Sequence, residues 1–131
     1  MADVYLDTSC FIYLVEGATA SRGAVEAHLR ALPAESGLMT SRLTRLECRV
    51  KPLRERDDVL LARYDAALAS RNVRMLELSE PVVERATELR ARYGFRTPDA
   101  LHLAAALDAA FVTGDAALAR CTELAVTIVP S

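Results

Sequence analysis

The chain has 131 residues, of which 52% are hydrophobic, and its formal net charge is -2. This length predicts a single domain spanning residues 1–131 with a substantial core, and the apolar content argues against a disordered chain. The near-neutral charge excludes a bulk polycation of the kind that binds DNA nonspecifically.

Alternating strand and helix patterns run through the whole chain. In chain order, the pattern predicts a strand at 4–6, helices at 10–16 and 21–32, a strand at 37–40, a helix from 41 to about 50, a helix at 57–70, a strand at 73–78, a helix at 80–93, a helix beginning at 97, a strand at 110–113, a short helix at 115–120 and a strand at 124–129. This alternation predicts an α/β fold, a three-layer α/β/α sandwich with a central, mainly parallel sheet.

Hydroxyl residues and a proline set the expected helix ends. Thr8 or Ser9 is predicted to cap the first helix, and Ser41 and Thr97 are predicted to cap the helices that follow them. Pro52 is expected to limit the helix that begins at Ser41, because proline lacks the amide hydrogen that a helix interior uses.

The helix beginning at Ser41 carries two stripes. Their members are Leu43, Leu46 and Val50 on the apolar stripe, and Arg42, Arg45 and Arg49 on the basic stripe. The apolar stripe is expected to face the core. Glu47 lies beside it and roughly opposite the arginines, so its side chain should point toward the protein. A half-buried acid without a local partner calls for a cation or hydrogen bonds.

Four acids fall where a parallel sheet would place a functional site. Asp7 follows the first strand, Asp115 follows the strand at 110–113, Asp99 opens a helix after Thr97-Pro98, and Glu47 faces inward. Carboxylates gathered together repel unless a divalent ion or protonation neutralises them. Oxygen-only ligands suit Mg²⁺ or Mn²⁺, and such ions can activate water for attack at phosphorus.

Hydroxyl groups flank these acids. Thr8 and Ser9 follow the first acid directly, and Thr113 lies two residues before the last. They can orient the carboxylates or water molecules bound to a metal. His102 lies one turn after Asp99. We expect a packed or partly exposed helix residue there, with contact to the site or proton transfer as the alternative.

The motifs resemble those of the PIN-domain ribonucleases, and in size and layout the VapC toxins of type II toxin–antitoxin modules. They are Asp7-Thr8-Ser9, Thr44-Arg45-Leu46-Glu47, Thr97-Pro98-Asp99-Ala100-Leu101-His102 and Val112-Thr113-Gly114-Asp115. The resemblance implies Mg²⁺- or Mn²⁺-dependent cleavage of RNA by a hydrolase whose catalytic, metal-binding residues are Asp7, Glu47, Asp99 and Asp115. It implies supporting roles for Ser9 and Thr113, a homodimer, and a small cognate antitoxin.

Each feature also has a structural explanation. Asp7 and Asp115 can cap the helices that follow them, Asp99 is favourable in any first helical turn, and Glu47 can pair with Lys51. The basic stripe of Arg42, Arg45 and Arg49 is a candidate contact for RNA or the antitoxin, with a solvated surface as the alternative.

The compartment and the competing functions follow from the same sequence. Cys10, Cys48 and Cys121 match no zinc-ligand spacing, the N-terminus does not resemble a signal peptide, and no apolar run is long enough for a membrane span. We expect a cytoplasmic toxin that cleaves RNA and does not enter a membrane. The alternatives are an RNA-processing PIN nuclease without an antitoxin, a noncatalytic RNA- or protein-binding module, and a metal-dependent phosphatase or DNA nuclease.

Overall fold

The computed structural model describes residues 3–17, 19–107 and 109–129. Within them the chain forms, in order, β1 (Val4–Leu6), α1 (Thr8–Glu16), α2 (Thr19–Ala31), β2 (Leu38–Ser41), α3 (Arg42–Arg54), α4 (Asp58–Leu68), β3 (Val73–Leu76), α5 (Glu80–Tyr93), α6 (Thr97–Ala105), β4 (Ala110–Thr113), the 3₁₀ helix η1 (Ala116–Arg120) and β5 (Ala125–Ile128). Every predicted strand is present, with its ends within two residues of the prediction.

The strands form one sheet in the order β3-β2-β1-β4-β5, and all neighbouring strands run parallel. From the central β1 the chain first builds one side of the sheet through β2 and β3, then the other through β4 and β5. The direction of growth therefore reverses between β1 and β4. Such a switch point leaves a crevice at the carboxyl ends of the two strands, where ligands of parallel sheets bind.

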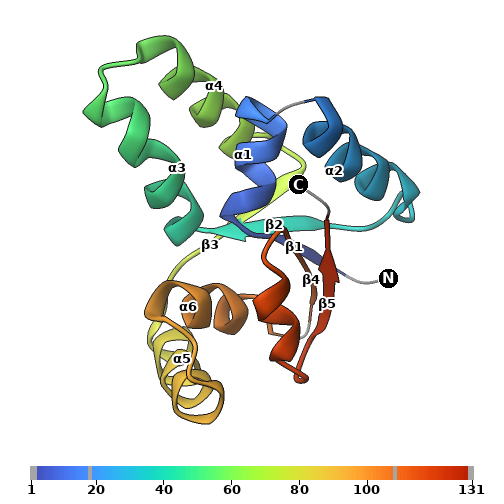
Figure 1. Cartoon of the computed structure of the whole chain (residues 1–131), viewed down its shortest axis with the longest axis vertical. Coiled ribbons are helices and arrows are strands. Elements are labelled where there is room, and N and C mark those ends of the chain that lie inside the picture. Colours follow the sequence, from blue (N-terminus) through green and yellow to red (C-terminus); the bar gives the residue numbers. More distant parts are fainter. Residues whose placement is uncertain (1–2, 18, 108, 130–131) are drawn as a thin grey trace.

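Helices cover both faces of the sheet. Figure 1 shows α1 to α4 on one face and α5 and α6 on the other. Successive residues of a strand point to opposite faces, so Leu6 and Val112 pack toward α1, whereas Tyr5 and Phe111 pack toward α6. Both faces are therefore apolar, and the predicted three-layer fold with a parallel sheet is confirmed.

The predicted cap of α1 is wrong. Asp7, rather than Thr8 or Ser9, is the N-cap residue, and its carboxylate accepts a hydrogen bond from the Cys10 amide at 3.4 Å. The two hydroxyl groups have other acceptors, because Ser9 donates to Asp7 and Thr8 donates to Glu47. The first acid of the predicted site is thus also a structural cap.

Three further helix ends differ from the prediction. Ser41 occupies the N-cap position of α3 without a capping side-chain hydrogen bond, and its hydroxyl accepts from Tyr5 instead. Arg96 is the N-cap residue of α6, which makes Thr97 the first helical residue. Pro52 does not limit α3 but lies inside its last turns, where its ring is buried. Burial of the ring offsets the backbone hydrogen bond that proline removes.

The inward face of α3 also differs from the predicted apolar stripe. The buried residues of this helix are Leu43, Thr44, Cys48 and Pro52. Leu46 and Val50, predicted to face the core, are 59% and 47% exposed. The helix is therefore rotated so that Glu47 lies between buried neighbours, and hydrophobicity alone did not reveal this because polar side chains occupy the inward positions.

Cys10, Cys48 and Cys121 are buried and form no disulfide. Among the described residues, no helix is both long enough and apolar enough to cross a lipid bilayer.

Candidate functional site

The candidate site lies at the edge of the sheet where β1 and β4 end, which we call the carboxyl edge. Leu6 pairs with Val112 in the parallel ladder, so the residues that follow them, Asp7 and Thr113, lie side by side. The Asp7 amide donates to the Val112 carbonyl at 3.2 Å and extends the ladder by one step. The strand register therefore brings the first acid against the loop that carries the last one.

Asp7 is a buried carboxylate held by hydroxyl groups. It is 6% exposed, and Ser9 Oγ and Thr113 Oγ1 donate to its two carboxylate oxygens. The Ser9 hydroxyl also accepts from the Gly114 amide at 2.9 Å. Burial raises the pKa of Asp7, although these hydroxyl groups and the nearby His102 act in the opposite direction. The hydrogen bonds to Asp7 only partly offset the cost of burying its negative charge, which favours binding of a cation beside this carboxylate.

Asp115 reaches the carboxyl edge from the loop after β4. Its amide donates to Thr113 Oγ1 at 3.0 Å, so one hydroxyl group contacts both Asp7 and the backbone of Asp115. Its carboxylate Oδ1 accepts from the Ala117 amide at 3.0 Å and caps η1. The capping role that we considered for this acid is present, and it uses one carboxylate oxygen.

Glu47 points toward the protein from α3, as its position on the helix predicts. Its Oε1 accepts from Thr8 Oγ1 at 2.6 Å and lies 2.7 Å from Nε2 of His102 on α6. Burial by itself raises the pKa of Glu47, but the hydrogen bonds from His102 and Thr8 outweigh it, so the pKa is lowered. Glu47 is therefore an anion at neutral pH. Lys51, the alternative partner, pairs with Glu16 at 2.8 Å.

Asp99 lies in the first turn of α6. Its Oδ2 is 3.3 Å from Nε of Arg96, and the two side chains are 19% and 79% exposed. The helix N-terminus stabilises this negative charge as well. Asp99 precedes His102 by three residues and so shares its side of the helix. The guanidinium of Arg96 adds a positive charge beside the acids, which the sequence patterns did not predict.

The structure brings the four acids to one edge of the sheet without gathering them into a closed cluster. Thr113 connects Asp7 to the backbone of Asp115, and Glu47 contacts α1 and α6. In the part of the chain that the structure describes, no group of three or more His, Cys, Asp or Glu side chains is arranged to hold a metal ion. The available donors are carboxylate and hydroxyl oxygens, which hard divalent cations prefer. A cation shared by three of these carboxylates would require them to move.

Two residues outside the predicted set of acids and hydroxyl groups contact the site. His102 is 4% exposed, so it is packed as expected, and Nε2 of its ring also makes the contact to the site that we considered as the alternative. Its Nδ1 lies 2.7 Å from the Tyr5 hydroxyl, which donates to Ser41 Oγ at 2.8 Å. The spacing of three residues from Asp99 could have placed His102 at the site. A tyrosine in an apolar strand is typical of a core residue, so Tyr5 gave no signal.

A groove on the exposed side of α3 has an apolar floor. It encloses about 350 Å³, and its lining residues are Arg42, Arg45, Leu46, Arg49, Val50 and Leu53. We call it the α3 groove. Leu46, Val50 and Leu53 leave about half of their surface in solvent. Neighbouring exposed leucine and valine side chains of this kind mark surfaces that bind partners.

The arginines of the α3 groove are already paired. Arg42 Nε lies 3.0 Å from Glu77, and Asp65 accepts from both Arg45 and Arg49. These pairs are partly exposed, so each contributes little to stability. The arginines of the basic stripe therefore border the apolar floor of the groove, and Glu77 and Asp65 partly neutralise their positive charge.

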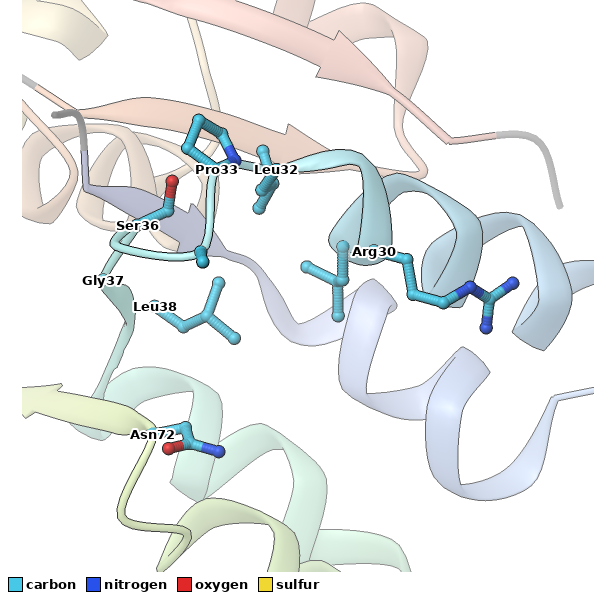
Figure 2. A pocket seen from close by; sticks show the side chains of 9 residues that line it. Arg30, Leu32, Pro33, Ser36, Gly37, Leu38 and Asn72 are labelled. Atoms are coloured by element: carbon cyan, nitrogen blue, oxygen red, sulfur yellow. The ribbon is translucent and has the colours of Figure 1, made fainter.

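Another hollow lies away from the carboxyl edge. It encloses about 630 Å³ around Leu32, Pro33 and Ser36, near the residues where β2 and β3 begin (Figure 2). It therefore lies at the opposite end of the strands, and its lining contains no carboxylate.

Solved structures of similar fold include toxin–antitoxin proteins. A chain of VapBC2 from Rickettsia felis, solved bound to a DNA fragment from the promoter, has a TM-score of 0.82 at 16% identity, with 97% of this chain and 98% of that chain covered. VapC20 from Mycobacterium tuberculosis, described as a Sarcin-Ricin loop cleaving toxin, has a TM-score of 0.75 at 19% identity, with 97% and 99% covered. A toxin–antitoxin complex from Klebsiella pneumoniae has a TM-score of 0.74 at 24% identity, with 95% of each chain covered.

Sequence comparison identifies the family. No curated protein matches the chain. The family model of the PIN domain matches residues 4–124, which include β1 to β4 and all four candidate acids. The chain belongs to the PIN domain family.

Proposed function

We propose that this protein is a divalent-metal-dependent endoribonuclease and the toxin of a type II toxin–antitoxin module. The observation that carries the proposal is the buried Asp7 carboxylate at the switch point of the sheet, with Glu47, Asp99 and Asp115 at the same edge. Membership of the PIN domain family supports a nuclease, and the similar folds of proteins described as toxin–antitoxin complexes support the toxin.

The oxygen donors at the carboxyl edge fit Mg²⁺ or Mn²⁺. We assign Asp7, Glu47, Asp99 and Asp115 as the acids that would hold the ion, because burial leaves Asp7 with negative charge that its hydrogen-bond donors do not fully offset. Such an ion supplies an activated water and stabilises the charge that develops at phosphorus.

The remaining residues of the edge orient the acids and the substrate. Ser9 and Thr113 fix both oxygens of Asp7, and Thr8 fixes one oxygen of Glu47. Arg96 is exposed beside Asp99, so its guanidinium can contact a phosphate of the bound RNA. We propose attack of water at phosphorus with departure of the 3′ oxygen, which produces a 5′-phosphate and a 3′-hydroxyl.

We assign the α3 groove to the antitoxin. Its apolar floor and arginine rim match an amphipathic helix with acidic residues along one border, since helices bind grooves through one apolar face. The proposal includes a homodimer in the cytoplasm, as the resemblance implies. Light scattering of the purified protein, alone and with the antitoxin encoded beside it, measures both associations.

An RNA-processing nuclease without an antitoxin and a noncatalytic binding module are the two competing functions. An RNA-processing nuclease would also cleave RNA, so it is distinguished from a toxin by whether a short neighbouring gene encodes a protein that binds this chain. The lack of a closed ligand cluster among the described residues favours a noncatalytic binding module. A cleavage assay distinguishes the binding module from a nuclease.

The test is cleavage of total cellular RNA by purified protein with Mg²⁺, Mn²⁺ or EDTA. Asp7→Asn removes one charge of the site and keeps an N-cap residue. Asp57→Asn is the matched control, because Asp57 also caps a helix, α4, through the Leu60 amide at 3.0 Å, and its side chain is exposed rather than part of the site. We expect discrete metal-dependent fragments from the wild type and the control only. Equal cleavage by Asp7→Asn would refute the site, and no cleavage by the wild type would favour the binding module.

A further inference from the structure

A chain of buried hydrogen bonds connects Glu47 to the interior of the protein. It runs from Glu47 through His102 to Tyr5 and ends at Ser41, over contacts of 2.7, 2.7 and 2.8 Å. We call these four residues the Glu47 network. His102 is 4% exposed, and Tyr5 and Ser41 are fully buried. The network therefore lies behind Glu47, whose own side chain is 30% exposed, and is shielded from solvent.

Both ring nitrogens of His102 have a partner. A carboxylate only accepts, so Nε2 of His102 carries the proton that Glu47 receives. Nδ1 lies 2.7 Å from the Tyr5 hydroxyl, which also contacts Ser41 Oγ at 2.8 Å. The imidazole is consequently held at both nitrogens and cannot rotate without breaking a buried hydrogen bond, which costs about 1–3 kcal/mol.

Tyr5 provides a rigid anchor for this imidazole. Its ring stacks on Phe111 with a centroid separation of 5.3 Å and an interplanar angle of 10°, and it meets the His102 ring edge-on at 5.9 Å. Burial raises the pKa of Tyr5, so the hydroxyl stays protonated. The Tyr5 and Phe111 rings are attached to β1 and β4 at the centre of the sheet. Their contacts therefore fix the position of His102 relative to these two strands.

Both donors to Glu47 act on the same oxygen. Thr8 Oγ1 and His102 Nε2 contact Oε1 at 2.6 and 2.7 Å. Within the described residues, Oε2 has no hydrogen-bond partner. Two donors from α1 and α6 on one oxygen fix the plane of the carboxylate and leave the other oxygen available for binding.

We propose that His102 and Tyr5 are positioning residues that orient the Glu47 carboxylate, so that Oε2 is presented to the metal or to the substrate at the carboxyl edge. The inference rests on the proposed function for what Glu47 binds. Residues that hydrogen-bond to a ligand carboxylate or imidazole commonly change metal affinity or activity 10–100-fold when they are replaced.

Two replacements of His102 separate its contacts. His102→Gln places an amide NH₂ near the position of Nε2 and can keep the hydrogen bond to Glu47. His102→Asn places the amide near Nδ1, so it can reach Tyr5 but not Glu47. Tyr5→Phe removes the anchor alone. Tyr64→Phe is the matched control, because Tyr64 is also a buried tyrosine, 1% exposed, whose hydroxyl donates to Glu16 on the opposite face of the sheet.

The first readout is Mn²⁺ affinity of the purified protein without RNA, measured from free Mn²⁺ by electron paramagnetic resonance. We expect His102→Asn to weaken Mn²⁺ binding about 10–100-fold. His102→Gln should recover most of the loss, Tyr5→Phe should show a smaller loss, and Tyr64→Phe should match the wild type. In RNA cleavage at limiting Mn²⁺, kcat should fall in the same order while KM for RNA stays unchanged.

The second readout needs neither metal nor activity. Ring nitrogens of His102 are followed by ¹H–¹⁵N spectroscopy in the metal-free protein, with His28 on α2 as the internal reference. Glu47→Gln and Tyr5→Phe should shift the His102 resonances and leave those of His28 in place.

The outcomes separate this inference from the proposed function. Wild-type Mn²⁺ affinity in His102→Asn, equal losses in His102→Gln and His102→Asn, or unmoved His102 resonances would overturn the positioning role. A wild type that binds Mn²⁺ and cleaves no RNA would instead refute the nuclease, while the order of Mn²⁺ affinities would still support or overturn the positioning role.

Discussion

Asp7 combines two roles that substitutions can separate, because its carboxylate both caps α1 and adds a buried negative charge. Asp7→Asn removes the charge and keeps the cap, since asparagine is about as good an N-cap as aspartate. Asp7→Ala removes both. The two variants lack the same charge, so the difference between them measures the hydrogen bonds alone.

The size of that difference follows from the contacts. Loss of the cap costs about 1 kcal/mol. The asparagine carbonyl can still accept from one of the hydroxyl groups of Ser9 and Thr113, whereas alanine accepts from neither, which costs about another 2 kcal/mol for a buried donor. Unfolding entropy of about 2.1 cal/mol/K per residue gives roughly 0.28 kcal/mol/K for this chain. Asp7→Ala should therefore melt about 11 °C below Asp7→Asn.

The charge itself makes stability depend on pH. Because burial raises the pKa of Asp7, the folded protein binds this proton more tightly than the unfolded chain does. The free energy of unfolding of the wild type therefore falls as the pH rises from the ordinary aspartate pKa through the raised one, and the penalty is complete above that window.

Differential scanning calorimetry in EDTA, from pH 3.5 to 8, measures both effects. Asp7→Asn should be more stable than the wild type at neutral pH, and this advantage should vanish below about pH 4. Added Mn²⁺ should raise the melting temperature of the wild type more than that of the variant. A wild type that is more stable than Asp7→Asn at pH 7 in EDTA, or equal melting of the Asn and Ala variants, would refute the reasoning.

Three further substitutions test the fold and the surfaces. Gly114→Ala should destabilise the protein by about 1–3 kcal/mol, because the new methyl group would overlap the Tyr13 hydroxyl and lie 2.8 Å from the Tyr13 ring; adding Tyr13→Ala should recover this in a double-mutant cycle of melting temperatures, and no recovery would contradict the steric account. Leu103→Ala, in the core at 0% exposure, should cost about 2–5 kcal/mol by urea denaturation, whereas Leu46→Ala should cost less than about 0.5 kcal/mol; similar losses would contradict the orientation of the helices. Arg49→Gln should change stability by less than about 1 kcal/mol and weaken binding of RNA or antitoxin in a salt-dependent way, and unchanged binding of both would leave the stripe as solvated surface.

Periodicity was sufficient for the sheet and for the loops that carry the acids. Each strand is short and mostly apolar, so its position depends on local sequence. The parallel arrangement follows from the helices between strands. Asp7 and Asp115 then lie at the carboxyl edge because they directly follow two strands.

Local patterns could not predict the rotation of α3. Thr44 and Cys48 are small enough to be buried against the sheet, and Glu47 turns inward because Thr8 and His102 donate to it. A prediction from the hydrophobic stripe alone places Thr44 and Cys48 on the exposed side of α3 and Leu46 on the buried side. In the structure Leu46 is exposed and lines the α3 groove.

Local sequence patterns could not predict the contacts between residues that are distant in the chain either. The hydrogen bonds of His102 join residues 97 and 55 positions apart, to Tyr5 and Glu47. Neither pairing leaves a periodic trace in the sequence. The caps at Asp7 and Arg96 were misassigned because the neighbouring hydroxyl residues have better side-chain acceptors elsewhere or lie inside the helix.

The central claim is that acids at the carboxyl edge direct water to the phosphodiester of RNA. The most direct test is the chemistry of the new RNA ends, determined by end-specific ligation and mass spectrometry of fragments produced by the wild type with Mn²⁺. Attack by water with departure of the 3′ oxygen predicts 5′-phosphate and 3′-hydroxyl ends that are absent with Asp7→Asn. Ends carrying a 2′,3′-cyclic phosphate and a 5′-hydroxyl would show attack by the ribose 2′-hydroxyl and would contradict the account.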